Sequence, residues 1–212
     1  MSYMKTYLFD FDGTLVDSMP TFISVMLKVL DENGISYAED IVKVITPLGY
    51  KGTAEYYQSL GVSLSVSEIM NRMTAYAEIE YRERILAKSH VIETLRVLKE
   101  RGDSLNILTA SPHNMLDPCL KRLGIYSLFN HIWSCDDFRK TKADVEIYQE
   151  AASCIGAKTQ DVVFLDDNVN ALKTAKKSGM VVYGVYDASS EDSRTQIEEL
   201  SDRYIIDFSE LI

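Results

Sequence analysis

Short apolar runs alternate with amphipathic segments along the second half of the chain, and this alternation restricts the fold more than any other feature of the sequence. The expected strands here span residues 104–109, 131–134, 162–165 and 180–185. The expected helices span residues 91–100, 115–123, 145–155 and 171–178. Because strands that alternate with helices indicate βαβ crossovers, the sequence predicts an α/β fold with a doubly wound, Rossmann-like parallel sheet.

The first part of the chain has a different pattern. Thr6 to Phe9 has the character of one short buried strand, and residues 204–206 are expected to form a last edge strand. Between them, residues 18–85 contain only helical patterns, at 20–31, 39–45, 53–60 and 67–85. The sequence therefore predicts an α/β core made of residues 1–17 and 86–212, with residues 18–85 inserted as a helical domain.

Composition and charge exclude several classes of function. The formal net charge of -10 over 212 residues disfavours non-specific binding to nucleic acid, which requires a basic face. No apolar run is long enough to cross a bilayer, and no signal peptide is visible before Asp10. Cys119, Cys135 and Cys154 have neither disulfide-framework nor zinc-site spacing. We expect a cytoplasmic protein without nucleic-acid or membrane partners, and the sequence does not indicate its oligomeric state.

Polar and charged side chains follow the expected strands, where an open parallel sheet binds its ligands. The relevant segments are Asp10 to Asp12 after the first strand, Thr109 to Ser111 after the second, Asp136 to Lys142 after the third, and Asp166 to Asn168 after the fourth. Carboxylates, hydroxyls and a lysine at one edge of a sheet are suited to a hard cation and a phosphate group. The pattern predicts a site for Mg²⁺ and phosphate.

Taken in order, these segments resemble the four motifs of the haloacid dehalogenase-like (HAD) hydrolase superfamily. The segment Asp10-Phe11-Asp12-Gly13-Thr14 resembles the D-x-D-G-T motif. Thr109, Lys142 and the pair Asp166-Asp167 are similar to the second, third and fourth motifs. The resemblance covers nearly the whole chain. It implies the branch with a helical C1-type cap, which includes phosphoglycolate phosphatases and β-phosphoglucomutases.

The resemblance implies two catalytic residues. Asp10 would attack the substrate phosphorus and form an aspartyl-phosphate. Asp12 would protonate the leaving alcohol and then accept a proton from the attacking water. Because haloacid dehalogenases and phosphonatases lack an acid at this second position, Asp12 argues against both of those chemistries.

The resemblance also implies the ligands of the phosphate group and of the metal. Thr109, Ala110 and Lys142 would bind the phosphate. Asp10, the backbone carbonyl of Asp12, and Asp167 would hold Mg²⁺.

Departures from the family pattern leave two assignments open. Lys142 lacks the prolines that usually follow the third-motif lysine, so Lys140 is an alternative. Asp166 stands where the family commonly has glycine, which leaves open whether Asp166 also contributes to the metal site. Capping of the following helix is a second possible role for Asp167.

The family resemblance further implies that residues 18–85 close over the phosphate site. Tyr50 and Lys51, in the expected turn from Leu48 to Gly52, are our candidates for cap residues that face the substrate.

The predicted function is Mg²⁺-dependent hydrolysis of a small phosphorylated metabolite, similar to phosphoglycolate or a sugar phosphate. A phosphomutase of the same superfamily is an alternative, although Phe22 takes the place of the cap histidine that those enzymes share. A phospho-acceptor switch, similar to response-regulator receiver domains, is a second alternative from a different class.

Overall fold

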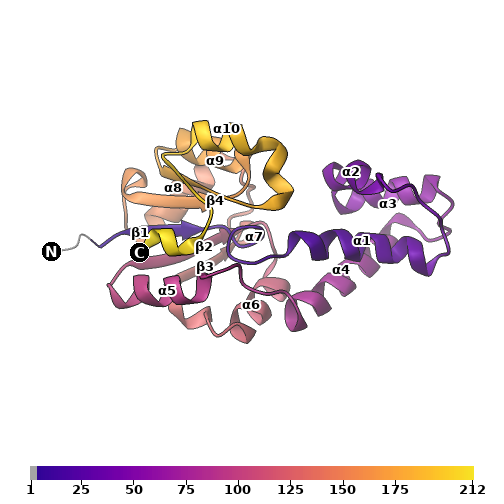
Figure 1. Ribbon diagram of the computed structural model, residues 1–212, viewed down its shortest axis with the longest axis horizontal. Coiled ribbons are helices and arrows are strands. Elements are labelled where there is room, and N and C mark those ends of the chain that lie inside the picture. The colour runs from indigo at the N-terminus through magenta and orange to yellow at the C-terminus, as the bar shows by residue number, and fades with distance from the viewer. Residues whose placement is uncertain (1–3) are drawn as a thin grey trace. The chain divides into compact units, whose positions relative to one another are not determined.

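The computed structural model describes residues 4–212, apart from the side chain of Pro47. The chain divides into two compact units (Figure 1). Met1–Asp17 and Leu86–Ile212 form the first, which we call the core unit, and Ser18–Ile85 form the second, which we call the helical unit. The helical unit is the segment in which the sequence predicts helices and no strands.

The core unit is built on a six-stranded sheet in the order β3-β2-β1-β4-β5-β6, and all its strand pairs are parallel. The strands are β1 (Thr6–Phe9), β2 (Ser104–Thr109), β3 (His131–Ser134), β4 (Val162–Asp166), β5 (Val181–Val185) and β6 (Arg203–Ile205). The chain proceeds in one direction from β1 to β3 and in the other from β4 to β6. This reversal between β1 and β4 creates the crevice at which open parallel sheets bind ligands. The predicted α/β fold with a doubly wound parallel sheet is confirmed.

Helices cover both faces of this sheet. They are α5 (Val91–Glu100), α6 (His113–Arg122), α7 (Cys135–Phe138), α8 (Val145–Ile155), α9 (Val169–Lys177) and α10 (Arg194–Leu200). Short 3₁₀ segments follow at η2 (Tyr126–Leu128), η3 (Thr159–Asp161), η4 (Ala188–Ser193) and η5 (Phe208–Leu211). Figure 1 shows α5 and α6 on one side of the sheet and α8, α9 and α10 on the other.

The central strand β1 is buried on both sides. Leu8 packs in the cluster formed with Tyr148 of α8 and Leu172 of α9. Its neighbour Phe9 points to the opposite face, where its ring lies 6.3 Å from that of Phe129 and 6.2 Å from that of Phe208. Leu8 and Phe9 are both fully buried, which explains why β1 is continuously apolar rather than alternating. This apolar strand is followed directly by an acidic residue, Asp10.

The helical unit contains α1 (Met19–Glu32), α2 (Ile41–Ile45), η1 (Thr46–Leu48), α3 (Gly49–Ser59) and α4 (Val66–Glu83). Val25, Met26 and Val29 form the buried stripe of α1 that the sequence periodicity predicts. A capping box begins α4, because Ser65 accepts from the backbone N–H of Glu68 while Glu68 accepts from that of Ser65.

The prediction of a turn between Leu48 and Gly52 is wrong. Helix α3 begins at Gly49, so Tyr50 and Lys51 lie in its first turn. Glycines at 49 and 52 lower helix propensity, but packing overrides this preference, since Tyr57 further along α3 is fully buried. A Cβ at position 52 would lie 3.0 Å from Cβ of Leu48, so glycine gives the closest packing of α3 against this residue.

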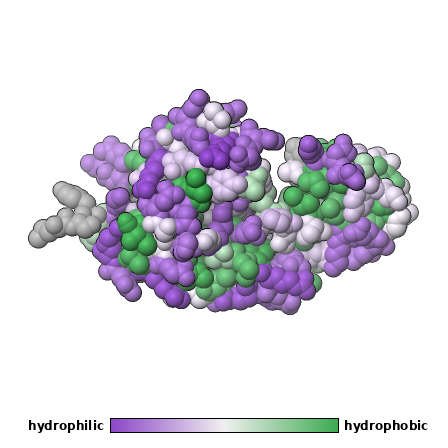
Figure 2. All heavy atoms as spheres, viewed as in Figure 1, coloured by the Kyte–Doolittle hydropathy of each residue, from purple (hydrophilic) through white to green (hydrophobic). Residues whose placement is uncertain are grey.

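The surface is largely hydrophilic in the view of Figure 2, where hydrophobic side chains appear in limited groups. Among residues 4–212, none of the helices combines the length and the apolar character that a membrane span requires.

Candidate active site

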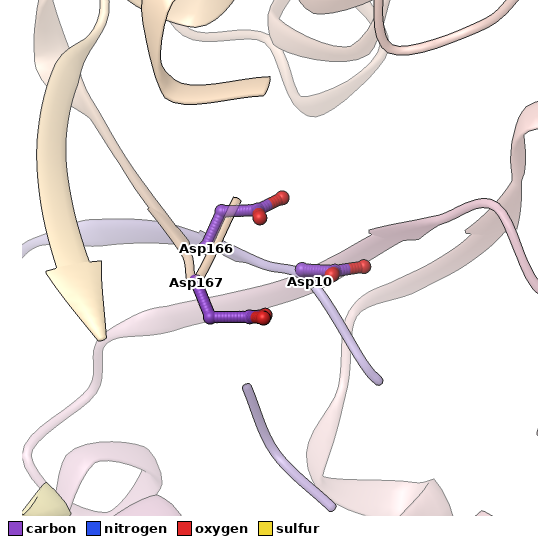
Figure 3. A group of neighbouring side chains, drawn as sticks. All are labelled: Asp10, Asp166 and Asp167. Atoms are coloured by element: carbon purple, nitrogen blue, oxygen red, sulfur yellow. The ribbon is translucent and has the colours of Figure 1, made fainter. Parts of the chain in front are cut away.

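Three aspartates meet where β1 and β4 end. Asp10 directly follows β1, Asp166 is the last residue of β4, and Asp167 comes next. The two strands are in register, and the backbone N–H of Asp10 donates to the carbonyl of Leu165 at 2.8 Å. One oxygen from each of the three carboxylates lies within 4.8 Å of the others. Figure 3 shows the three side chains beside one another with their carboxylates pointing the same way.

Burial makes this cluster electrostatically costly. The exposed fraction is 7% for Asp10, 0% for Asp166 and 7% for Asp167. Burial, more than the charges of Asp166 and Asp167, raises the pKa of Asp10 well above its usual range, against the opposing effect of Lys142. Burial and the charges of Asp166 and Asp187 raise the pKa of Asp167 to about 7. A cation placed among these carboxylates would relieve their repulsion.

Lys142 supplies one positive charge to the cluster. Its Nζ lies 2.5 Å from Oδ1 of Asp10 and 2.8 Å from Oδ2 of Asp166. Burial alone would lower the pKa of Lys142, but the carboxylates of Asp10 and Asp166 raise it above its ordinary value. The hydroxyl of the buried Tyr148 donates to the carbonyl of Lys142 at 3.0 Å, which anchors the lysine to α8. Lys140 instead pairs with Glu150 at 2.8 Å, so of the two candidate lysines Lys142 is the one at the cluster.

Asp167 is held from two directions. The hydroxyl of Thr14 donates to its Oδ1 at 3.0 Å, and the hydroxyl of Ser190 donates to its Oδ2 at 3.2 Å. Gly13 lies so close that a Cβ there would be 2.6 Å from Oδ2 of Asp167, and its φ of +71° also favours glycine. Asp167 does not cap α9, because the side chain of Asn168 accepts from the first N–H groups of that helix.

Asp166 has a different set of partners from its neighbour. One of its oxygens meets Lys142, and the other accepts from the backbone N–H of Asn168 at 2.7 Å. Both oxygens of Asp166 are therefore engaged with donors of the core unit, and its carboxylate orients Lys142 toward Asp10.

Asp12 comes two residues after Asp10, in the loop that follows β1. Its Oδ2 accepts a hydrogen bond from the hydroxyl of Ser111, which follows β2. The two acids of the first motif therefore have different partners, since Asp10 contacts a lysine and Asp12 a neutral hydroxyl.

Thr109 and Ala110 lie at the end of β2, as predicted. Thr109 is buried, and its hydroxyl oxygen accepts from the backbone N–H of Ser111 at 3.1 Å. Ala110 lines a cavity of about 310 Å³ together with Asp10, Lys142 and residues of α9. The structure thus brings together the candidate residues Asp10, Asp12, Thr109, Ala110, Lys142 and Asp167 at one edge of the core unit.

The remaining candidates, Tyr50 and Lys51, belong to the helical unit. The ring of Tyr50 stacks on Phe22, with 5.2 Å between centroids and 10° between planes. Nζ of Lys51 lies 3.9 Å from a carboxylate oxygen of Glu55, and both side chains are exposed. Substrate recognition by Tyr50 and Lys51 stays a prediction.

Ser190 belongs to the site but is absent from the predicted site residues, which follow the first four strands. It lies in η4, shortly after β5. The position of Asp187 and Ser190 after the carboxyl end of Val181–Val185 is the sequence signal that points to them.

The donor set of the cluster fits a hard divalent cation. If Asp10, Asp166 and Asp167 are all ionised, three negative charges face the one positive charge of Lys142, which leaves two unmatched. Carboxylate oxygens are the ligands that Mg²⁺ and Ca²⁺ prefer.

Comparison with known proteins identifies the family. The sequence model of the haloacid dehalogenase-like hydrolases matches residues 7–185. This chain belongs to that family. The expectation of a HAD-like hydrolase is therefore confirmed.

Individual members of the family have low sequence identity to this chain. The chain is 23% identical to validoxylamine A 7'-phosphate phosphatase of Streptomyces hygroscopicus subsp. limoneus, over 85% of each protein. It is 28% identical to the pyrophosphatase PpaX of Bacillus velezensis, over 84% of this chain and 81% of that protein. The solved structure of a predicted phosphoglycolate phosphatase from Haemophilus somnus aligns with a TM-score of 0.82 at 19% identity, over 100% of this chain and 97% of that one. The structural likeness supports the fold.

Proposed function

We propose that this chain is a Mg²⁺-dependent phosphatase that hydrolyses a small phosphorylated metabolite through an aspartyl-phosphate on Asp10. The observation that carries the proposal is the position of Lys142, whose ammonium contacts Asp10 beside the other two buried carboxylates. Membership of the hydrolase family supports it, as do relatives named for phosphatase activity on a phosphorylated small molecule and on pyrophosphate.

Asp10, Asp167 and the backbone carbonyl of Asp12 would hold Mg²⁺. When bound, the ion would offset the negative charge of a substrate phosphate and of the carboxylates around it. Asp166 is the less suitable ligand, because the ammonium of Lys142 already offsets the charge of its carboxylate. The two oxygens of Asp167 accept instead from the neutral hydroxyls of Thr14 and Ser190, which leave its charge uncompensated. We assign Asp166 the task of orienting Lys142.

The first half of the proposed reaction transfers the phosphoryl group to the protein. A carboxylate oxygen of Asp10 forms a bond to phosphorus while the bond to the leaving alcohol oxygen breaks. The leaving oxygen takes the electron pair of that bond and the proton of the Asp12 carboxyl group. Lys142 favours the ionised, nucleophilic form of Asp10.

The second half releases inorganic phosphate. A water molecule attacks the phosphorus of the aspartyl-phosphate and gives a proton to Asp12, and the bond between phosphorus and the Asp10 oxygen breaks. Asp12 thereby regains its proton, and Asp10 regains its charge. The hydrogen bond from Ser111 holds Asp12 at the end of β2 for both proton transfers, and we assign Thr109 and Ala110 the task of binding the phosphate oxygens.

The test is a panel of phosphorylated metabolites, assayed with Mg²⁺ and with EDTA, on the wild type and on Asp10→Asn. We expect phosphate release that requires Mg²⁺, and a loss of at least about a thousandfold in kcat for Asp10→Asn, as is typical when a covalent nucleophile is removed. Asp161→Asn is the matched control, because this exposed aspartate precedes β4 at the opposite edge of the sheet.

The same assay separates the alternatives. Retained turnover in Asp10→Asn would show that the nucleophile is assigned wrongly. Transfer of the phosphate to another position of the substrate, without its release, would identify a phosphomutase. An aspartyl-phosphate that persists for minutes would indicate a phospho-acceptor switch.

A further inference from the structure

Lys88 is a mostly buried lysine that the proposed reaction does not use, with 17% of its side chain exposed. It lies in the segment that follows residue 85, at the second entry of the chain into the core unit. Its ammonium donates to the carbonyl of Gly13 at 2.7 Å and to the carbonyl of Tyr186, and it pairs with Oδ2 of Asp187 at 3.0 Å. These three contacts can use all three N–H groups of the ammonium.

The partners of Lys88 belong to two separate loops of the core unit. Gly13 lies in the loop after β1, whereas Tyr186 and Asp187 lie in the loop after β5. The backbone N–H of Lys88 adds a further contact to the first loop, because it donates to the carbonyl of Leu15 at 3.0 Å. One lysine therefore joins two loops that are distant in sequence.

Each of these loops also supplies a hydroxyl group to Asp167. Thr14, next to Gly13, donates to Oδ1, and Ser190, three residues after Asp187, donates to Oδ2. The orientation of the Asp167 carboxylate thus depends on the relative positions of the two loops that Lys88 connects.

The loop after β5 is built around the buried carboxylate of Asp187, which is 6% exposed. Its Oδ1 accepts from the backbone N–H and the hydroxyl of Ser189, at 2.9 and 2.6 Å. Its backbone carbonyl accepts from the N–H of Ser190 at 3.1 Å. Lys88 satisfies the other carboxylate oxygen, and a buried carboxylate without that partner would be costly.

From these contacts we propose that Lys88 is a positioning residue for the metal site. It fixes the loops after β1 and β5 so that Thr14 and Ser190 hold the Asp167 carboxylate in a geometry that binds a divalent cation. The inference rests on the proposed function, in which Asp167 is a metal ligand.

An electrostatic role and a positioning role of Lys88 predict opposite changes in the affinity for a divalent cation when Lys88 is replaced. An ammonium group near a cation site repels the cation, so a purely electrostatic role predicts that Lys88→Met binds a divalent cation more tightly. Positioning predicts weaker binding, because residues that orient metal ligands typically contribute a factor of about 10 to 100 in affinity. The sign of the change therefore distinguishes the two roles.

The experiment titrates the full-length, metal-free protein with Mn²⁺ and follows the electron paramagnetic resonance signal of free Mn²⁺. We expect the Kd for Mn²⁺ to rise about tenfold or more in Lys88→Met and to stay near the wild-type value in Lys88→Arg, which keeps the charge and the donors. Lys176→Met is the matched control, because Nζ of Lys176 also bridges a backbone carbonyl, that of Leu200, and a carboxylate, that of Asp202.

Ser190→Ala tests whether Lys88 affects Mn²⁺ binding through the hydroxyl of Ser190. This test does not depend on the folding of a Lys88 variant. It removes one hydroxyl from Asp167, and we expect a rise of several-fold in the Kd for Mn²⁺. Because Lys88 acts partly through Ser190, the double variant should lose less affinity than the product of the two single losses.

Four results would overturn the inference. The first is wild-type or tighter Mn²⁺ binding in Lys88→Met, and the second is an unchanged Kd in Ser190→Ala. The third is an equal loss in Lys88→Met and Lys176→Met, which would indicate general destabilisation. The fourth is a wild-type protein that does not bind Mn²⁺, and this outcome alone would also reject the metal site of the proposed function.

Discussion

Gly13 shows how closely one residue determines the candidate site. The loop after β1 must turn sharply enough to bring the hydroxyl of Thr14 to Asp167, and it does so with a φ of +71° at Gly13. The glycine also leaves space for Asp167, since a Cβ would lie 2.6 Å from its Oδ2. Backbone conformation and close approach both require glycine at this position.

We expect Gly13→Ala to lower the free energy of unfolding by about 1–2 kcal/mol from the left-handed backbone alone, and to weaken Mn²⁺ binding through displacement of Asp167. Gly34→Ala is the control, because Gly34 has a similar φ of +66° but no heavy atom within 4 Å of an added Cβ. Thermal unfolding and Mn²⁺ titration measure the two effects. Gly34→Ala should reproduce the loss of stability and leave Mn²⁺ binding unchanged. Equal Mn²⁺ binding in both variants would contradict the role of the close approach.

Among the site residues, the sequence could identify residue types at strand ends but could not choose between neighbours. Lys140 and Lys142 differ by two positions. The hydrogen bond from Tyr148 to the carbonyl of Lys142 and the ion pair of its ammonium with Asp166 direct Lys142 to Asp10. Likewise, the sequence left open whether Asp167 caps α9, because that depends on which side chain reaches the first N–H groups of the helix. In the structure Asn168 does so.

At the level of helices and strands, the sequence predicted β2, β3, α5 and α8 with the bounds that the structure has. Helices α6 and α9 begin two residues before their predicted starts, at His113 and Val169. Of the four added residues, His113, Asn114 and Asn170 are polar. Periodicity does not detect a helix start that is set by backbone hydrogen bonds and caps.

The start of α5 has an unusual residue. His90 occupies the N-cap position with a φ of +57°, a conformation that glycine adopts more easily. Its ring Nδ1 lies 2.8 Å from a carboxylate oxygen of Asp207, near the start of η5. A hydrogen bond to Asp207 and the charge of that carboxylate raise the pKa of His90, which itself is largely exposed.

The raised pKa of His90 determines the sign of a pH-dependent effect. The pair stabilises the fold fully below the unfolded-state pKa of histidine, about 6.5, and this contribution is lost as pH rises through the higher folded-state pKa. His90→Gly removes the pair and relieves the backbone. At pH 9 we therefore expect a Tm about 2 °C above that of the wild type, whereas at pH 5.5 the advantage should shrink or reverse.

Calorimetry of the wild type and of His90→Gly at pH 5.5, 7 and 9 measures this effect. His131→Gln serves as a control for the loss of a histidine elsewhere in the core unit, where the ring contacts the side chain of Asn106. A difference in Tm between His90→Gly and the wild type that does not change with pH would show that the contact with Asp207 contributes nothing to stability.

At the scale of the whole molecule, the core unit joins the two points at which the chain leaves it and re-enters it. The chain leaves this unit after Asp17 and returns at Leu86, and the N–H of Asp17 donates to the carbonyl of Leu86 at 3.0 Å. Val16 forms an antiparallel bridge with Ala87 beside it. The exit and the return are thus joined by backbone hydrogen bonds of the core unit alone, and the loop that spans them need not be long.

This arrangement predicts that the core unit folds when a linker of about four glycine and serine residues replaces residues 18–85. The shortened chain keeps Asp10, Asp167, Lys88 and the loops around them. We therefore expect a cooperative thermal transition, a Kd for Mn²⁺ within about threefold of the wild type, and continued hydrolysis of a small activated substrate such as acetyl phosphate.

If residues 18–85 act as the proposed cap, selectivity among larger phosphorylated metabolites should fall in the shortened chain, because closure and contacts to the organic part of the substrate are lost. Asp10→Asn in the shortened chain controls for background hydrolysis. A shortened chain that folds and binds Mn²⁺ but keeps the full selectivity of the wild type would assign recognition of the substrate to the core unit and remove it from Tyr50 and Lys51.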